Sequence, residues 1–249
     1  MSEKTVIKFA TFNVGDFSGV DMKRGSEESR EAYRNVMLGV GADLWFLQED
    51  YRYFNDETNE KAFEAVYSDV YQNYERCFTG PPNGKAFLSR FELKDVHPVD
   101  YVGDMQFRHP WFLTGKINVG GKEVTIINLH FDWYDKVVRA VEIKQVIEYA
   151  KTQEYCIIAG DFNPSNRINE KIVGPNPMFE EDYAYFKDAG FEMANCGEFG
   201  IFHTILDAGH EPFPYDNIMV TPNMKIISAE RVAEPWMQDH AIVVANIEI

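Results

Sequence analysis

The segment from Tyr155 to Asn163 constrains the fold of this chain more than any other stretch. It opens with a short apolar run, Tyr-Cys-Ile-Ile-Ala, of the kind that fills a strand buried on both faces. The run stops at Gly160, and Asp161 and Asn163 follow two residues apart. On extended backbone, residues two apart face the same way, so a carboxylate and a carboxamide are expected side by side. Taken alone, the segment fits an Asx turn, in which these side chains bond their own backbone, better than a binding site.

Polar side chains stand at the ends of several other predicted strands. Apolar runs predict strands over residues 5–13, 44–47, 73–78, 85–89, 111–119, 123–129, 215–220, 225–231 and 241–249. The polar groups that follow or precede such runs are Asn13, Glu49, His130, Asp161 with Asn163, Asp216, and Asp239 with His240. One rim of the sheets would gather all of these groups, and this shared placement favours a functional site over an isolated turn.

The remaining pattern predicts one domain that spans residues 1–249. Helices are expected over residues 57–71, 135–151 and 178–189, and a further helix begins at Ser26 and ends at Gly39 and Gly41. The Gly120-Gly121 pair predicts a tight hairpin, so at least one pair of strands is antiparallel. No linker, low-complexity tract or fixed-period repeat divides the chain. The expected fold class is α/β, with a mixed sheet system inside and helices outside.

The net charge of −16 limits the partners that this protein would bind. It argues against nonspecific adhesion to nucleic acid or anionic membranes, because phosphate contacts need Lys and Arg. A phosphate-containing substrate is still compatible, because a metal ion supplies positive charge locally. The cysteines, Cys77, Cys156 and Cys196, have neither disulfide nor metal spacing, which predicts buried thiols and a reducing compartment. With no signal-peptide core and no membrane-spanning run, we expect a cytoplasmic protein.

The strand-end groups together point to a reaction class. Brought to one place, these carboxylates would repel one another unless a cation lay among them. Oxygen ligands with few histidines and no thiolate favour Mg²⁺, Mn²⁺ or Ca²⁺ over zinc. Two histidines next to carboxylates add acid–base capacity near neutral pH. This combination predicts metal-assisted hydrolysis of a phosphoester.

Several short motifs, taken in order, resemble the endonuclease/exonuclease/phosphatase superfamily, which contains deoxyribonuclease I, apurinic endonucleases, neutral sphingomyelinases and inositol polyphosphate 5-phosphatases. The most specific motifs are Leu47-Gln48-Glu49, Asn128-Leu129-His130, Gly160-Asp161-Phe162-Asn163 and Gln238-Asp239-His240, with a further match over residues 85–90. The resemblance covers nearly the whole chain. It implies a deoxyribonuclease I-like four-layer α/β sandwich, with two packed mixed β-sheets flanked by helices.

The resemblance also implies which residues bind the metal and the scissile phosphate. Glu49 matches the carboxylate that binds the divalent metal, with Asn13 and Asp239 close to it. The metal implied is Mg²⁺, with Mn²⁺ as an alternative. His130 and His240 match the two histidines that straddle the scissile phosphate. Which residue serves as base and which as acid stays open, as does the number of metal ions.

Five further positions match residues that assist the reaction in this superfamily. Asp161 matches the carboxylate that orients or deprotonates the attacking water, and Asn163 the group that holds a phosphate oxygen. Asp216 matches the carboxylate paired with the C-terminal histidine. Glu75 stands where the deoxyribonuclease I branch has a glutamate supporting the other histidine, although an exposed ion pair with the next arginine explains it equally well. Arg108 matches an arginine that contacts the phosphate, for which a planar donor fork is suited.

The match weakens where the DNA-cutting branch touches DNA. Gly15 and Tyr51 stand where that branch carries arginines, and no basic stripe replaces them. Trp133 and Tyr134 fit either a substrate wall or packing of the next helix, with packing favoured for at least one of them.

The leading prediction is a metal-dependent phosphoesterase that hydrolyses a phosphodiester or a phosphomonoester by water attack. A small molecule or a lipid head group is favoured as the substrate, with nucleic acid disfavoured by charge, and no obligate protein partner is inferred. The alternatives are an endonuclease or exonuclease, and a catalytically inactive module of the same fold that binds a phosphate ligand. Superfamily membership does not choose among these, because function lies in the loops around a shared rim.

Overall fold

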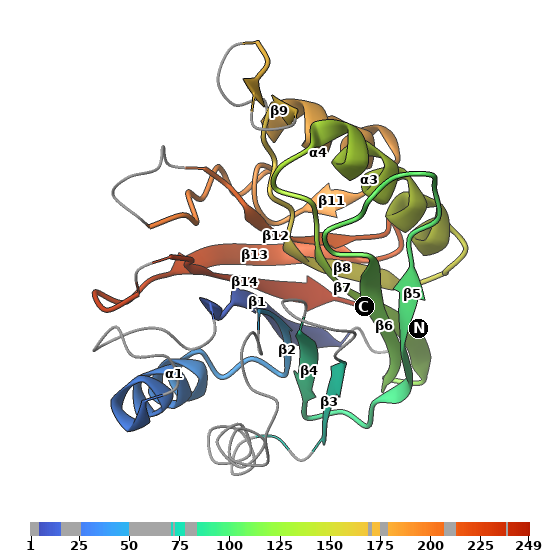
Figure 1. Cartoon of the computed structure of the whole chain (residues 1–249). Coiled ribbons are helices and arrows are strands. Elements are labelled where there is room, and N and C mark those ends of the chain that lie inside the picture. Colours follow the sequence, from blue (N-terminus) through green and yellow to red (C-terminus); the bar gives the residue numbers. More distant parts are fainter. Residues whose placement is uncertain are drawn as a thin grey trace.

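The computed structural model describes residues 5–15, 26–49, 71, 73–77, 84–168, 171–174, 179–206, 213–237 and 239–249. Two six-stranded sheets pack face to face, and helices cover their outer faces (Figure 1). Both sheets are mixed, which confirms the predicted sandwich of two mixed sheets flanked by helices. None of the described helices is both long enough and apolar enough to cross a membrane.

The first sheet contains the first and last strands of the chain, side by side. Its order is β13-β14-β1-β2-β4-β3, with β1 and β2 parallel and the other neighbours antiparallel. Its strands are β1 (Val6–Asn13), β2 (Leu44–Gln48), β3 (Asn73–Cys77), β4 (Lys85–Ser89), β13 (Lys225–Val232) and β14 (Ile242–Glu248).

The second sheet is built from the middle of the chain. Its order is β11-β12-β8-β7-β6-β5, with β7 and β8 parallel and the other neighbours antiparallel. Its strands are β5 (Lys94–Asp100), β6 (Trp111–Val119), β7 (Lys122–His130), β8 (Cys156–Asp161), β11 (Glu192–Met193) and β12 (Asp216–Val220). The predicted hairpin joins β6 to β7, and Gly120 and Gly121 have the positive φ angles, 57° and 85°, that a tight turn of this kind requires. A short pair, β9 (Arg167–Ile168) and β10 (Lys171–Ile172), stands apart from both sheets.

Three helices are described: α1 (Glu27–Val40), α3 (Lys136–Lys151) and α4 (Phe179–Asp188). Figure 1 shows α1 against the first sheet and α3 and α4 against the second. The Ser26 side chain accepts a hydrogen bond from the Ser29 N–H, as predicted for the cap of α1. This helix ends at Gly41, in the left-handed region, so the expectation that Gly39 also ends it is wrong. The helix predicted over residues 57–71 lies almost entirely outside the described residues.

Apolar side chains fill three layers between these elements. Phe9, Phe46 and Ile126 belong to the core between the two sheets. Ala10, next to Phe9 in β1, belongs instead to the core beneath α1, because successive side chains of a strand point to opposite faces. Ile143 of α3 helps to form the third core, over the second sheet. Burial on both faces explains why the central strands read as nearly continuous apolar runs.

The strand β5 was not among the sequence predictions. Three of its seven residues are charged, it contains Pro98, and it remains mostly exposed at the edge of the second sheet. Proline and charged side chains are typical of edge strands, where they hinder pairing with other chains. An apolar-run criterion misses such a strand because the strand buries little apolar surface.

Strand register brings the polar strand ends to one rim. Asn13 pairs with Gln48 across parallel β1 and β2, which places Glu49 immediately beyond this rim. In the second sheet, Asp161 pairs with His130 on one side and with Asp216 on the other.

Gly160 permits this close pairing of β7 and β8. A Cβ atom at Gly160 would lie 2.0 Å from the Leu129 carbonyl oxygen, and the residue has a φ of 148°. A side chain here would push the two strands apart directly before Asp161. The glycine of the Gly-Asp-Phe-Asn motif is therefore required by backbone packing.

Candidate active site

Asp161 is the point at which the site residues converge. Its carboxylate is buried, and Oδ2 accepts a hydrogen bond of 3.1 Å from Asn13 Nδ2 of the other sheet. The same oxygen lies 3.5 Å from His130 Nε2 and 3.6 Å from His240 Nε2. Three side chains from distant parts of the chain thus meet at one carboxylate oxygen of Asp161.

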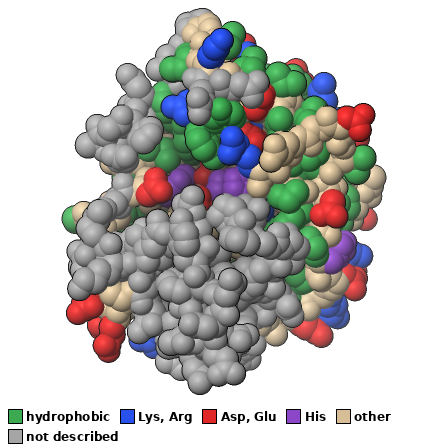
Figure 2. All heavy atoms as spheres, viewed as in Figure 1, with side chains coloured by type: hydrophobic (Ala, Val, Ile, Leu, Met, Phe, Trp, Pro, Cys, Tyr) green, Lys and Arg blue, Asp and Glu red, His purple; other side chains and the backbone are tan. Residues whose placement is uncertain are grey.

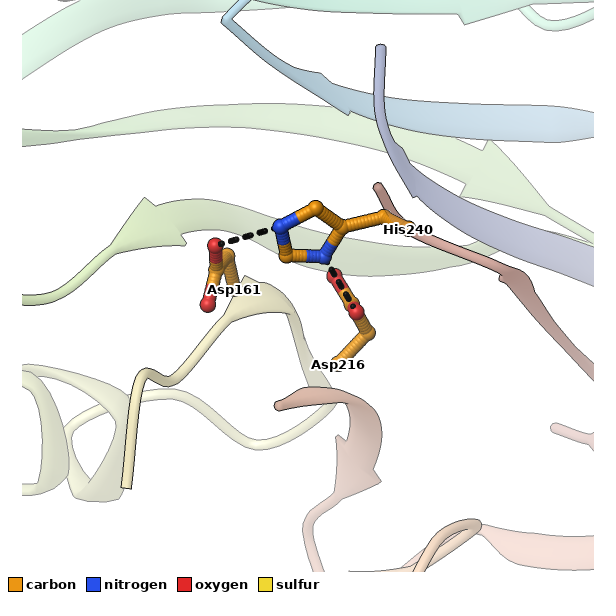
Figure 3. A group of neighbouring side chains, drawn as sticks. All are labelled: Asp161, Asp216 and His240. Atoms are coloured by element: carbon orange, nitrogen blue, oxygen red, sulfur yellow. Dashed lines mark hydrogen bonds and ion pairs between the residues drawn. The ribbon is translucent and has the colours of Figure 1, made fainter. Parts of the chain in front are cut away.

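His240 is held in place by a second buried carboxylate. Its Nδ1 donates a hydrogen bond of 2.8 Å to Asp216 Oδ2, which leaves Nε2 facing Asp161. Figure 3 shows the imidazole between the two carboxylates. Asp216 is fully buried at the start of β12, and its backbone N–H donates to Thr204 Oγ1 at 3.0 Å. The arrangement fixes the orientation of the ring and stabilises an imidazolium if one forms.

The charges in this cluster shift both titrating groups upward. Burial alone lowers the pKa of His240, but the negative charges of Asp216 and Asp161 and the hydrogen bond to Asp216 outweigh it, so this pKa lies well above its usual range. Burial also raises the pKa of Asp161, and the nearby charge of Asp216 adds to this effect. Both groups therefore hold a proton more tightly than they would in water.

His130 lies on the opposite side of Asp161 from Asp216. Its Nε2 is 3.9 Å from Glu49 Oε1, and its ring stacks on His109 with centroids 3.8 Å apart. His109 belongs to the loop before β6, and its side chain is buried against His130. Glu75 belongs to β3, and its side chain lies outside the described part of the structure.

The Asx turn and the site coexist. The Asn163 N–H donates to Asp161 Oδ1 at 3.0 Å, which is the turn anticipated from Gly-Asp-Phe-Asn. The other oxygen of Asp161, Oδ2, faces Asn13 and the histidines. Asn163 Nδ2 donates to the Phe131 carbonyl oxygen at 3.2 Å, and this holds the carboxamide near the end of β7.

A cavity of about 300 Å³ opens beside these groups. Figure 2 shows histidine side chains in the middle of this face, with acidic side chains next to them and Lys or Arg side chains above. The described residues that line the cavity are Glu49, His130, Trp133, Asp161, Asn163, Ser165, Arg167, Ile205, Tyr215, Asp239 and His240. Asn13 and Asp216 lie behind this lining, within hydrogen-bond distance of Asp161 and His240 respectively.

The two arginines near the site are placed differently. Arg108, matched to a phosphate-contacting arginine, lines a neighbouring cavity of about 350 Å³ and lies 3.6 Å from Asp132 Oδ2. Arg167 lines the cavity beside Asp161 instead. Sequence reasoning missed Arg167 because it lies in the two-residue strand β9, where no apolar run marks the strand or predicts the direction of its side chains.

A buried amide bridge behind the site was also missed. Asn128 Nδ2 donates to the Leu47 and Ala86 carbonyl oxygens of the first sheet at 2.8 and 3.0 Å, and its Oδ1 accepts from Gln48 Nε2 at 2.7 Å. These bonds join the two sheets directly behind His130 and Glu49. Asn128 belongs to a family motif, but its role as a bridge depends on partners that are distant in sequence.

The donor set suits a hard divalent cation. Glu49 and Asp239 bring further carboxylates to the cavity beside Asp161, and carboxylate oxygen is the ligand that Mg²⁺ and Mn²⁺ prefer. Among the described residues, Asp161, Asp216 and His240 place potential ligand atoms within 4.8 Å of one another. His240 Nδ1 already engages Asp216, however, so the Glu49 side of Asp161 fits an ion better than the Asp216 side does.

A comparison with known protein families shows to which family this chain belongs. The sequence profile of the Endonuclease/Exonuclease/phosphatase family matches residues 10–240. The chain belongs to this family. The proteins of this family are hydrolases that act on phosphate esters. A search among curated proteins gave no match.

Solved structures of the endonuclease/exonuclease/phosphatase fold resemble the whole chain. One from Beutenbergia cavernae DSM 12333 has a TM-score of 0.76 and 14% identity, covering 98% of this chain and 72% of that chain. A 3'-5' exonuclease from Neisseria meningitidis has a TM-score of 0.67 and 19% identity, and the match covers 96% of this chain and 98% of that chain. D. rerio TDP2 complexed with a single strand DNA product has a TM-score of 0.67 and 12% identity, and the match covers 98% of this chain and 99% of that chain. At these identities the likeness shows the fold.

Proposed function

We propose that this protein is a Mg²⁺-dependent phosphoesterase, with Mn²⁺ as an alternative ion, that hydrolyses a phosphodiester or phosphomonoester by water attack. One observation carries the proposal: two histidine Nε2 atoms lie 3.5 and 3.6 Å from a single buried carboxylate oxygen, with Glu49 beside them. A structural surface has no need of such a cluster, whereas phosphoester hydrolysis needs charged groups on several sides of one phosphate.

The side chains of this cluster have complementary roles in the proposed reaction. Asp161 accepts the proton of the attacking water or orients it, since its Oδ2 faces the cavity side of both histidines. His240, charged because of Asp216, donates from Nε2 to a phosphate oxygen. Asn163 Nδ2 donates to another phosphate oxygen, and His130 faces the phosphate from the opposite side. Charge that develops on these oxygens is thereby stabilised.

Glu49 would hold the divalent cation, with Asp239 and the Asn13 side chain close to it. When bound, the ion supplies positive charge to the phosphate and lowers the pKa of a bound water. The Asn13 Oδ1 atom accepts from the Gly15 N–H at 3.1 Å, which keeps the amide in a fixed orientation. We also propose a cytoplasmic location, which the two described cysteines, both free, fit.

We expect Glu49→Gln to weaken metal binding and activity together. Loss of the carboxylate charge should raise the Mn²⁺ concentration needed for half-maximal hydrolysis of bis(p-nitrophenyl) phosphate about 10- to 100-fold. Chelation by EDTA should abolish the hydrolysis by the unaltered protein, and Mg²⁺ should restore it. Calorimetry of Mn²⁺ binding checks the affinity without relying on turnover.

The matched control is Glu148→Gln, an exposed glutamate of α3. This change should leave both the metal affinity and the activity within about twofold of the unaltered protein, since surface charges away from the site contribute little. Equal losses in the two variants, or activity that survives EDTA, would contradict a metal site at Glu49.

Nucleic acid is the second candidate substrate. One structural neighbour is a 3'-5' exonuclease and another is complexed with a single strand DNA product. The preference for a small molecule or a lipid head group rests on the net charge, and the comparisons lend it no support. Cleavage of labelled single-stranded and duplex oligonucleotides at low salt distinguishes nuclease activity from that of a general phosphoesterase. An inactive binding module is the third reading, which binding of phosphate without turnover would favour.

A further inference from the structure

One wall of the cavity has no part in the proposed hydrolysis. Trp133, Arg167 and Tyr215 line the cavity together with the histidines and carboxylates. The Trp133 side chain is 43% exposed, although tryptophan is usually well buried. An exposed indole that lines a cavity offers a large flat apolar surface, together with an N–H donor, to a ligand.

Two arginines lie over the Trp133 ring. The guanidinium carbon of Arg108 is 5.3 Å from the indole centroid and 4.2 Å from the Tyr134 ring centroid. The guanidinium carbon of Arg167 is 5.9 Å from the indole centroid. Figure 2 shows Lys or Arg side chains among hydrophobic ones directly above the histidines. The wall thus combines flat stacking surfaces with positive charge in a chain whose net charge is −16.

The chemistry of this wall discriminates between the alcohols that a phosphate ester can carry. A quaternary ammonium group such as choline would be repelled by Arg167, which lines the cavity, and by Arg108 in the neighbouring cavity. A polyol would find few hydrogen-bond acceptors on an indole and two guanidinium groups. A nucleobase has a flat π-face and ring acceptors, and it stacks on tryptophan and on guanidinium planes.

A second aromatic surface lies beside His240. Tyr215 has its ring centroid 6.5 Å from that of His240 and stacks on Phe213 at 6.0 Å with an interplanar angle of 13°. Tyr215 therefore adds a second large aromatic ring, besides Trp133, to the lining of the cavity. A substrate that carries a flat group next to its phosphate fits a cavity built in this way.

We propose that Trp133 and Arg167 form a subsite for a nucleobase next to the scissile phosphate, so that the substrate is a nucleotidyl ester. The inference rests on the proposed function, because the cluster around Asp161 positions the phosphate. A stacking subsite of this kind needs few phosphate contacts, since base stacking supplies binding energy without neutralising charge. It is therefore compatible with an acidic protein.

Three phosphodiesters with the same p-nitrophenol leaving group test this subsite: the p-nitrophenyl esters of thymidine 5'-phosphate, of methyl phosphate and of phosphorylcholine. The unaltered protein should hydrolyse the thymidine ester with a kcat/KM at least about 10-fold above that of the other two. Trp133→Ala should lower kcat/KM about 5- to 100-fold for the thymidine ester and less than twofold for the methyl ester. Arg167→Gln should also lower kcat/KM more for the thymidine ester than for the methyl ester. Trp133→Phe should retain most of the preference for the thymidine ester.

The matched control is Tyr185→Ala. Tyr185 is an aromatic residue of α4, 39% exposed, with Lys144 Nζ 5.9 Å from its ring centroid, but it does not line this cavity. Tyr185→Ala should leave kcat/KM unchanged for all three esters. Equal losses on the thymidine and methyl esters in Trp133→Ala, or preference for phosphorylcholine, would overturn the subsite while leaving the hydrolase intact.

Binding measurements keep the two proposals separate. Calorimetry should show tighter binding of thymidine 5'-monophosphate than of methyl phosphate, and the difference should vanish in Trp133→Ala. If none of the esters is hydrolysed, the proposed function fails, and the binding difference still decides the subsite. Competition with the thymidine ester by single-stranded oligothymidylate or by free thymidine 5'-monophosphate supports the subsite. The stronger competitor shows whether the subsite takes a nucleic acid or a free nucleotide. Competition by neither would overturn it.

Discussion

Replacement of His240 by alanine should lower kcat/KM for phosphodiester hydrolysis by about 10²- to 10⁴-fold, the range typical of a positioned acid or base. The variant loses the Nε2 donor that lies 3.6 Å from Asp161 Oδ2. It also leaves the buried carboxylate of Asp216 without the partner that its Oδ2 contacts at 2.8 Å. Steady-state kinetics with saturating Mg²⁺ measure the loss.

His97→Ala is the control for this change, because His97 is exposed on the edge strand β5 and does not line the cavity. Its kcat/KM should stay within about twofold of the unaltered value. Circular dichroism of both variants establishes whether the fold is intact. If His240→Ala folds normally and keeps more than about a tenth of the activity, His240 does not carry the role assigned to it.

The second large effect is expected in stability. Arg139→Met should lower the free energy of unfolding by about 3–5 kcal/mol, the usual cost of leaving one partner of a buried ion pair alone. Arg139 is fully buried in α3, and its Nε donates to Asp182 Oδ2 of α4 at 2.7 Å. Its Nη1 donates to the Asp132 carbonyl oxygen at 2.7 Å, and its Nη2 contacts the Ser165 carbonyl oxygen.

This single side chain ties together the segments that follow β7 and β8. The first segment starts directly after His130 and the second contains Asn163, so loss of Arg139 should disturb both the fold and the site. Urea unfolding followed by tryptophan fluorescence measures the change in free energy. The control is Arg90→Met, whose ion pair with Asp43 at 3.1 Å is largely exposed and should contribute less than about 1 kcal/mol. An equally small change in Arg139→Met would show that the buried bonds contribute little.

The sequence predicted the architecture well where apolar runs were long. Strands such as β2 and β8 are buried on both faces, so their sequences are apolar almost throughout, and polar residues mark where they end. The rim followed from these ends, because Asp161 pairs with His130 and Asp216 in neighbouring strands. The edge strand β5 gave no such signal, since it is mostly exposed and contains Pro98.

Side-chain roles that depend on tertiary neighbours were beyond the sequence. Asn128 bridges to Leu47, 81 residues earlier, through a backbone carbonyl that no local pattern reveals. Arg108 lies in a loop and Arg167 in the two-residue strand β9, and local spacing fixes the side-chain direction of neither. His109 has no apolar periodicity around it, yet it is buried against His130. Contacts with residues distant in sequence, rather than local propensity, decide each of these placements.

A crystal structure with Mn²⁺ and inorganic phosphate tests the central claim most directly. The account predicts an anomalous difference peak bonded to Glu49. It also predicts a phosphate that accepts hydrogen bonds from His240 Nε2 and Asn163 Nδ2 beside Asp161. A cavity that stays without ion and phosphate at saturating concentrations, or an ion bound away from Glu49 and Asp161, would contradict it.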